Sequence, residues 1–340
     1  MARRGHEMLI AAPPESRIYT EAKKLGMTVH ALPIACKSFA GLFALRSLLK
    51  TEAVQLVNTH SSTDSWLVSL ARLGMSNPPA IVRTRHISAP IPRNAGTRWL
   101  YTQAAAFVVT TGEALRRQVV DETGADPARV VSVPSGVDLQ RFRPGNRAAA
   151  RASLGLPPDI FLVGIVATLR SWKGHRFLLD AMAAIADTQI RAVIVGAGPG
   201  EENLRRQIVG LGLADRVTMA GQQEDVVPWL QSLNVFALPS YANEGVPQAI
   251  MQAMACGLPV ITTAVGAISE VARDGVTALM VPPQDAGALA AAIVRLHADP
   301  ELCARMGEAA LAEAGVRFAN PVMLDAMERV FAAAVPGRGA

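Results

Sequence analysis

Short apolar runs rich in β-branched residues alternate with helical patterns along this chain of 340 residues. Runs of this length are typical of parallel strands, and their alternation with helices is typical of βαβ units. The pattern predicts an α/β fold, although length alone leaves one large barrel possible. Before residue 145 the predicted strands, taken as buried and parallel after the first, are Met8–Ala11, Val29–Pro33, Leu56–Thr59, Ala80–Arg83, Phe107–Thr110 and Val130–Val133.

The alternation starts again after Pro144-Gly145-Asn146. We therefore predict two Rossmann-like domains facing across a cleft, over residues 1–145 and 146–318. A helix within residues 319–340 is expected to pack back on the first domain. The strands predicted for the second domain are Phe161–Ala167, Arg191–Gly196, Arg216–Ala220, Val235–Pro239, Pro259–Thr262 and Ala278–Val281, with helices at Gln248–Cys256 and Ala286–His297.

The beginning of the chain differs from the usual opening of such a domain, which is a strand, a glycine-containing turn and a helix. Ala2-Arg3-Arg4-Gly5-His6-Glu7 is typical of a helix end that leads into the strand Met8–Ala11. We therefore expect the first βα unit to be absent from this chain.

Positive charge is concentrated in the first domain. Residues 1–145 contain 18 Lys and Arg against 10 Asp and Glu, a net charge of +8, which leaves −3 for the remainder. This asymmetry suits an acidic substrate or an anionic membrane surface, and a solvated basic face is an equally good interpretation. Nucleic acid is not expected, because aromatic residues make up 5% of the chain and no basic stretch is interleaved with stacking side chains.

Sequence signals for export and for metal binding are missing. No uncharged apolar run of about eighteen residues occurs, and Glu7 stands where a secretion signal needs apolar residues. Cys36, Cys256 and Cys303 lie far apart without metal-ligand spacing, so neither a disulfide framework nor a zinc site is predicted. A cytoplasmic protein is expected.

Two cations follow the first strand of the second domain. Arg170 and Lys173 come after Phe161–Ala167, at the edge of the sheet where open α/β folds bind ligands. An arginine fork and a lysine point charge suit a diphosphate. A charged, solvated loop is the alternative.

Glycines follow the next strand, in Gly196-Ala197-Gly198-Pro199-Gly200-Glu201. The third glycine comes one position too early for the Gly-x-Gly-x-x-Gly dinucleotide motif, so NAD binding is not expected. The glycines let the backbone approach a ligand, or they form a tight turn. Gly196 and Gly198 are assigned to the ligand site, with Gly221 after the following strand.

A third segment, Glu244-Gly245-Val246-Pro247, precedes a predicted helix. Pro247 suits the first helical position, and the N–H groups of Gly245 and Val246 would face an anion. Glu244 can accept hydroxyl hydrogens of a sugar, or it can cap the helix. Gln252 is turned from Glu244 by about 80° at helical periodicity, so both side chains can line one pocket.

These ordered segments resemble family 4 of the retaining, group 1 glycosyltransferases, which have the GT-B fold, over essentially the whole chain. Arg170 and Lys173 match the family's diphosphate-binding cations, and Glu244 matches the first acid of its Glu, seven residues, Glu signature. Gln252 replaces the second Glu, normally a ribose-hydroxyl acceptor, and keeps an accepting amide oxygen. The other matching segments are Pro134-Ser135-Gly136-Val137-Asp138, with Ser135 in place of Asn, Gly266-Ala267-Ile268-Ser269-Glu270-Val271 and Asp274-Gly275.

Polar residues also follow two strands of the first domain. His60 and Ser61 follow one strand, and Arg85 and His86 follow the next, so both histidines are expected to point into the cleft. The resemblance implies that His86 lies near the transferred sugar. His60, Ser61 and Arg85 are assigned to the acceptor side of the cleft. For each histidine, a packed or solvent-facing side chain is the alternative.

The resemblance implies a metal-independent retaining glycosyltransferase that needs no cofactor beyond its co-substrate, a UDP-, GDP- or ADP-sugar. The second domain would bind this donor, and the first would bind a glycan or lipid-linked acceptor. Leaving-group charge would be stabilised by cations and helix-end N–H groups, and no Asp-x-Asp pair of the metal-dependent kind is present. The catalytic set is His86, Arg170, Lys173 and Glu244, and the donor-binding set is Gly196, Gly198, Gly221, Gly245, Val246, Pro247 and Gln252.

The basic first domain adds the expectation of an acidic lipid-linked acceptor, as in lipopolysaccharide or other cell-envelope polysaccharide biosynthesis. The enzyme would then work at the inner face of the cytoplasmic membrane. Two alternatives stay open. One is a UDP-sugar 2-epimerase on the same fold, and the other is a non-catalytic relative, favoured by Gln252 and the unusual start, that binds sugar nucleotide without turnover.

Overall fold

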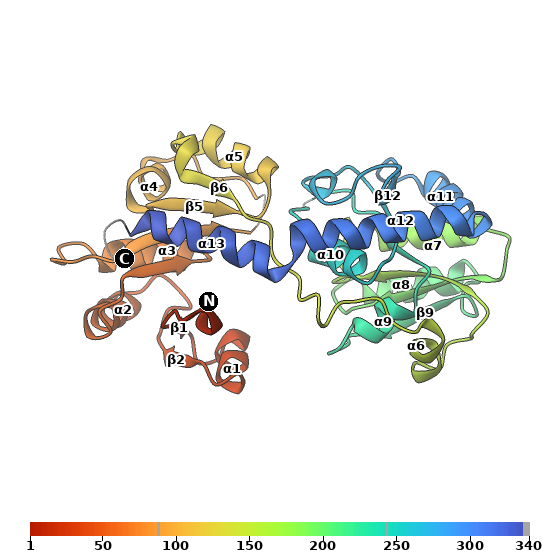
Figure 1. Cartoon of the computed structure of the whole chain (residues 1–340), viewed down its shortest axis with the longest axis horizontal. Coiled ribbons are helices and arrows are strands. Elements are labelled where there is room, and N and C mark those ends of the chain that lie inside the picture. Colours follow the sequence, from red (N-terminus) through yellow and green to blue (C-terminus); the bar gives the residue numbers. More distant parts are fainter. Residues whose placement is uncertain (87–88, 243, 336–340) are drawn as a thin grey trace. The chain divides into compact units, whose positions relative to one another are not determined.

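The computed structural model describes residues 1–86, 89–242 and 244–335, and the chain divides into two compact units (Figure 1). Unit 1 comprises Met1–Val133 and Leu324–Ala340, and unit 2 comprises Pro134–Met323. The predicted boundary at residue 145 falls inside unit 2. The segment before residue 145 belongs to unit 2 because it is bonded to that unit: the Val137 N–H donates to the carbonyl of Phe318 (2.7 Å).

The larger sheet of unit 1 is parallel and has the order β3-β4-β5-β6. Apolar residues such as Ile81, Val108 and Val119 are almost completely buried around it. The ends of each strand lie within two residues of the predicted ends. The agreement arises because the short apolar runs used for the prediction are also the residues that the sheet buries. The strands are β3 (Leu56–Thr59), β4 (Ala80–Arg85), β5 (Phe107–Thr110) and β6 (Val130–Ser132), and the helices are α2 (Phe39–Thr51), α3 (Ser62–Ala71), α4 (Ala95–Trp99) and α5 (Glu113–Thr123).

The strands β1 (Leu9–Ala12) and β2 (Thr28–Ala31) form a separate two-stranded parallel sheet with α1 (Arg17–Lys24). The prediction of a buried strand at Val29–Pro33 is therefore wrong in its burial, since both ends of β2 are exposed. A 3₁₀ turn at Ala2–Arg4 precedes β1. The expectation of an absent opening unit stays a prediction.

The sheet of unit 2 is parallel and has the order β12-β11-β10-β7-β8-β9. After β9 the chain returns to pair β10 with β7, so the direction of strand addition reverses between these two strands. Ligands of open α/β sheets bind outside the carboxyl ends of the strands at such a reversal. The strands are β7 (Phe161–Val166), β8 (Ile190–Val195), β9 (Val217–Gly221), β10 (Val235–Leu238), β11 (Val260–Thr262) and β12 (Ala278–Met280).

The helices of unit 2 cover a core in which β7 and β10 are nearly or completely buried. They are α6 (Arg147–Ser153), α7 (His175–Ala184), α8 (Glu201–Gly210), α9 (Val227–Ser232), α10 (Gln248–Ala255), α11 (Ala286–Ala298) and α12 (Pro300–Glu313). The last helix, α13 (Asn320–Ala334), continues from unit 2 into unit 1. There Arg4 Nη1 lies 2.6 Å from both Asp325 Oδ1 and Glu328 Oε2, which ties this helix to the first residues of the chain.

Candidate functional site

The loops that follow β7 and β10 meet at the reversal of strand order in unit 2. Arg170 and Lys173 lie in the first loop, the latter in the 3₁₀ turn Ser171–Lys173, and Glu244 lies in the second. The N–H of Tyr241 donates to the carbonyl of Trp172 (2.9 Å), so the two loops are joined through their backbones. The parallel pairing of β7 with β10 thus brings together side chains more than seventy residues apart.

Glu244 forms an ion pair with Lys173. The ammonium Nζ lies 2.8 Å from Oε1 and 3.0 Å from Oε2, and Ser240 Oγ donates to Oε1 at 2.6 Å. Glu244 is only 4% exposed, whereas the Lys173 side chain is 20% exposed. An ammonium has three donors and this carboxylate takes two, so the bonds among the described residues leave one N–H of Lys173 for a ligand.

Arg170 stands at the solvent-facing side of the same loop. It is exposed, and its guanidinium Cζ lies 5.7 Å from the ring centre of Trp172. An exposed fork beside a partly exposed ammonium is a suitable pair of groups for a diphosphate.

The glycines after β8 have a different immediate role from the one predicted. A Cβ at Gly196, whose φ is +141°, would lie 2.0 Å from the carbonyl oxygen of Ala167, and one at Gly198 would lie 2.8 Å from the nitrogen of Leu169. The N–H of Leu169 also donates to the carbonyl of Ala197 (3.1 Å). These glycines therefore let the loops after β7 and β8 pack on each other, whereas a Cβ at Gly221 would meet open space.

The start of α10 corrects two predictions. Pro247 is the N-cap residue and not the first helical residue, and the helix begins at Gln248. Glu244 therefore lies outside the helix, so the rotation of about 80° assumed between it and Gln252 does not apply. Glu244 also makes no capping hydrogen bond, because its carboxylate is held by Lys173 and Ser240. Gly245 and Val246 form the bend before the helix.

Three residues near this site were not predicted to belong to it. Gln248 Nε2 donates to the carbonyl of Gly136 (3.0 Å), which ties α10 to the segment that begins at Pro134. A Cβ at Gly266 would lie 2.0 Å from the carbonyl oxygen of Glu244. The matched segment that includes Gly266 was a usable signal, but nothing in the sequence identified Ser240 as a partner of Glu244. Gln252 lies one turn after Gln248 and is half-buried.

His175 is another group that the sequence did not single out. It is 2% exposed, and its Nε2 atom has no hydrogen-bond partner. Burial, reinforced by the charge of Lys173 and opposed by a hydrogen bond to the backbone of Arg170, lowers the pKa of His175 to about 4. Its imidazole is therefore neutral at physiological pH.

In unit 1, His60 and His86 form a stacked pair. Their ring centroids are 5.3 Å apart with planes at 12°, and His60 Nδ1 lies 3.0 Å from His86 Nε2. Partial burial lowers the pKa of both rings, and the charge of His86 lowers that of His60 further, while Asp64 opposes both shifts. The structure thus brings together two predicted residues, each of which keeps an exposed surface.

Ser61 and Arg85 have structural partners. Ser61 caps α3, because its side chain accepts the N–H of Asp64 while the Asp64 carboxylate accepts backbone N–H groups in return. Arg85 Nη1 donates to the hydroxyl of Tyr101 (3.2 Å), and its Nη2 donates to the carbonyl of Ala89. Capping explains Ser61 without a ligand.

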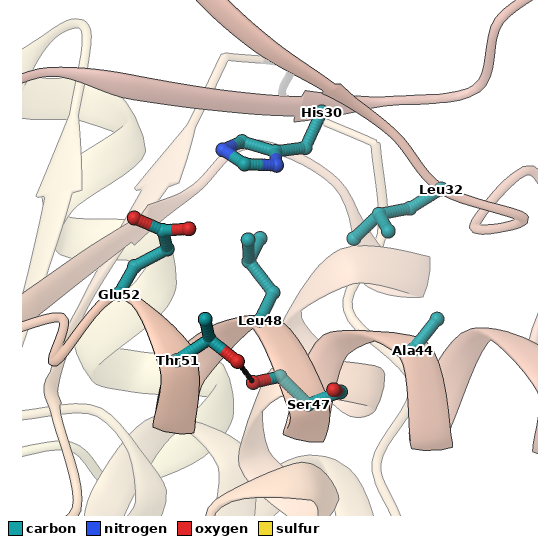
Figure 2. Close-up of a pocket in the computed structure, with 7 residues that line it drawn as sticks. All are labelled: His30, Leu32, Ala44, Ser47, Leu48, Thr51 and Glu52. Atoms are coloured by element: carbon teal, nitrogen blue, oxygen red, sulfur yellow. Dashed lines mark hydrogen bonds between the residues drawn. The ribbon is translucent and has the colours of Figure 1, made fainter.

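A surface groove of unit 1 lies away from these residues. Figure 2 shows it between the His30 and Leu32 side chains on one side and α2, with Leu48 and Glu52, on the other. None of the predicted site residues lines it. Among the described residues, none of the helices has the length and apolar character needed to cross a membrane.

Comparison with known proteins identifies relatives for both units. The profile of Glycosyltransferase Family 4 matches residues 1–141, and that of Glycosyl transferases group 1 matches residues 158–299. The chain is 32% identical over 301 residues to the D-inositol 3-phosphate glycosyltransferase of Mycobacterium tuberculosis H37Rv. The match covers 81% of this chain and 61% of that relative, so the chain spans less than two thirds of the relative's length.

Solved structures have the same fold. A glycosyltransferase from Rickettsia africae ESF-5 matches with a TM-score of 0.88 and 19% identity, over 99% of this chain and 92% of the other. The Anabaena protein Alr3699/HepE in complex with UDP matches with a TM-score of 0.82 and 21% identity, over 96% and 92% of the two chains. At these identities the likeness supports the fold alone.

Removing the cation beside Glu244 is expected to destabilise unit 2. Lys173→Met should lower the free energy of unfolding by about 3 kcal/mol, because it leaves a buried carboxylate without its cation. The double variant Lys173→Met, Glu244→Gln should lose less, since no buried charge remains. Urea unfolding measures both, with Arg205→Met, which breaks the exposed pair with Glu201, as a control expected to lose about 1 kcal/mol or less. If Lys173→Met and Arg205→Met lower the free energy of unfolding equally, the Lys173–Glu244 pair is not buried in solution.

His175 is expected to make unit 2 less stable in acid. The unfolded histidine binds a proton below about pH 6.5, whereas the folded one stays neutral down to about pH 4. Protonation therefore favours the unfolded chain as the pH falls through this window, by up to about 3 kcal/mol. Urea unfolding from pH 7 to pH 4 should show a steeper loss of stability in the native chain than in His175→Gln. If the free energy of unfolding depends on pH in the same way in both proteins, the imidazole of His175 is not buried in solution.

Proposed function

Because this chain belongs to family 4 of the group 1 glycosyltransferases and has their GT-B fold of two Rossmann-like units, we propose that it transfers a sugar from a nucleotide-sugar donor to an acceptor. The observation that carries the proposal is the position of Arg170, Lys173 and Glu244. All three lie in the loops after β7 and β10, where the strand order of unit 2 reverses. This is the place where open α/β sheets bind nucleotides.

The donor diphosphate would be held by Arg170, by the remaining N–H of Lys173 and by backbone N–H groups before α10. These groups stabilise negative charge on the diphosphate as the glycosidic bond breaks, and that is the charge a metal would otherwise neutralise. Glu244 would accept sugar hydroxyl hydrogens, and Gln252 would bind ribose through its amide oxygen. The family resemblance implies retention at the anomeric carbon, so the proposal is a metal-independent transfer with that stereochemical outcome.

We choose a UDP-sugar as the first donor to test, since the Anabaena neighbour forms complexes with UDP and with UDP-glucose. GDP- and ADP-sugars are the comparison donors. A non-catalytic binder of sugar nucleotides is a second candidate, favoured by Gln252 at the position of the family's second Glu. It predicts donor binding without transfer or hydrolysis.

Unit 1 would bind the acceptor, a glycan or a lipid-linked glycan precursor that carries negative charge. Residues 1–133 contain 16 Lys and Arg against 9 Asp and Glu, and residues 324–340 contain two of each kind, so unit 1 has a net charge of +7, which supports this part of the proposal. His86, held by His60, would hydrogen-bond the transferred sugar or the acceptor as a neutral imidazole, and its lowered pKa supports that protonation state.

A face of α2 suggests where an anionic membrane would contact unit 1. Phe39 is 81% exposed and Phe43 is 65% exposed, and both are large apolar side chains. Lys50 follows on the same stripe, within about 40° of both at helical periodicity, and Lys37 lies just before the helix. Exposed aromatics combined with lysines are typical of peripheral helices that insert into the headgroup region.

Donor binding is tested by thermal unfolding with UDP-, GDP- and ADP-sugars. A donor at about a hundred times its Kd should stabilise the protein by about 2.7 kcal/mol. Arg170→Ala should abolish most of this gain, whereas Arg205→Ala, an exposed arginine on α8, should keep it. Stabilisation without turnover would favour the non-catalytic candidate. No stabilisation by any donor would contradict the proposed site.

Membrane binding is tested by sedimentation with phosphatidylglycerol vesicles, with phosphatidylcholine vesicles for comparison. The double variant Phe39→Ser, Phe43→Ser should bind anionic vesicles at least tenfold more weakly, because the inserted rings are lost. Val209→Ser is the matched control, since Val209 is 74% exposed on α8 of unit 2. If both variants bind as the native chain does, the face of α2 is not a membrane contact.

A further inference from the structure

Arg83 is a buried cation that lacks hydrogen-bond partners. It lies in β4 and is 7% exposed, and neither its Nε nor its Nη1 atom has a partner. Within the described ranges, no carboxylate forms an ion pair with Arg83. Buried charges are normally paired or hydrogen-bonded, because their removal from water is otherwise costly.

A second arginine lies on the same face of β4. Side chains alternate along a strand, so Arg83 and Arg85 point to one side, with their Cα atoms about 7 Å apart. Both reach Tyr101, which is 3% exposed: the Cζ atom of Arg83 lies 4.5 Å from its ring centre, and Arg85 Nη1 lies 3.2 Å from its hydroxyl. The Nε atom of Arg85 is also buried without a partner. Two guanidinium groups thus share one tyrosine, and no acid in the described part of the chain is bonded to either.

Two other covered arginines, Arg151 and Arg72, are satisfied by oxygen atoms, whereas the buried Nε of half-buried Arg191 also lacks a partner. Arg151, 4% exposed, donates to the carbonyls of Ser232 (3.0 Å) and Pro158 (2.6 Å) and to Asn234 Oδ1 (2.6 Å). Arg72 donates to the carbonyls of Pro79 and Ala104. Stacking on Tyr101 offsets part of the cost at Arg83, but it uses none of the N–H donors.

We propose that Arg83, Arg85 and the hydroxyl of Tyr101 form a subsite for a phosphate group on the acceptor. A phosphate accepts several N–H donors in the geometry that a guanidinium fork offers, and it cancels the repulsion between the two cations. The subsite lies in the strand that leads directly to His86, so a phosphate bound there would place the rest of the acceptor near that imidazole. Its role as an acceptor subsite rests on the proposed transferase function, whereas phosphate binding itself does not.

The experiment uses inorganic phosphate as the probe and the full chain as the protein. Thermal unfolding is followed across a phosphate titration for the native chain, Arg83→Met and a control, Arg117→Met, whose arginine on α5 is 74% exposed. We expect the phosphate-dependent rise in Tm to be at least halved in Arg83→Met and unchanged in the control. Without phosphate, Arg83→Met should have the same Tm as the native chain or a higher one, because an unpaired buried charge has been replaced by an apolar side chain of similar length.

A structural role for Arg83 gives the opposite result. If Arg83 only packs on Tyr101, Arg83→Met lowers the Tm and leaves the phosphate effect intact, which would overturn the proposal. Binding of UDP is measured on the same proteins and should not differ between them. If the native chain does not bind UDP, the proposed donor site is contradicted. A phosphate effect that depends on Arg83 would still support the subsite in that case.

The source of the phosphate is distinguished by two further ligands. Glycerol 3-phosphate represents a soluble phosphorylated acceptor, and phosphatidylcholine vesicles with and without phosphatidic acid represent a lipid-borne one. Suppose that Arg83→Met weakens the binding of one of these two ligands tenfold or more and Arg117→Met does not. That result supports the subsite, and the ligand affected identifies the class of acceptor. Binding of both that is independent of Arg83 contradicts it.

Discussion

The carboxylate of Glu244 is almost completely buried, and this imposes a constraint on unit 2. A buried charge of this kind needs a cation and hydrogen bonds, and Lys173 and Ser240 supply them. Lys173 belongs to the loop after β7, while Ser240 and Glu244 belong to the loop after β10. The ion pair therefore fixes two loops across the reversal of strand order and places the free N–H of Lys173 and the Arg170 fork along one edge of the sheet.

The backbone reinforces this arrangement through close contacts. A Cβ at Gly174, whose φ is +80°, would lie 1.9 Å from the carbonyl oxygen of Pro239, so the loops after β7 and β10 touch through their main chains. Gly196 allows the same closeness between the loops after β7 and β8. Larger side chains at these positions would push the loops apart. The loops proposed to bind the donor diphosphate are thus held in place before a ligand arrives, which would lower the entropy lost on binding and let charge stabilisation act without rearrangement.

The sequence predicted each of the twelve strands that the structure describes, because a strand buried in a parallel sheet has to consist of a short run of apolar residues. It overestimated the burial of β2, whose pairing with β1 alone leaves it partly open. It placed Lys173 after a strand and Glu244 just before a helix, but their ion pair depends on β10 pairing with β7, which residue spacing does not encode. It ended β4 at Arg83, whereas the strand continues to Arg85. Tyr101, which covers that guanidinium, lies in a later segment of the chain.

The two units treat buried charge in different ways, and the difference follows from what each would bind. In unit 2 the buried carboxylate already has its cation, so the loops are held together without a ligand, and the proposed donor would have only to add contacts. In unit 1 the buried guanidinium of Arg83 has no carboxylate partner among the described residues, and its Nε and Nη1 donors are unused. Such a group costs stability in the empty protein, and that cost is removed only by a ligand with the complementary charge. An acceptor without a negative group would leave this cost in place, so the same arginine that strengthens binding of an acidic acceptor discriminates against a neutral one.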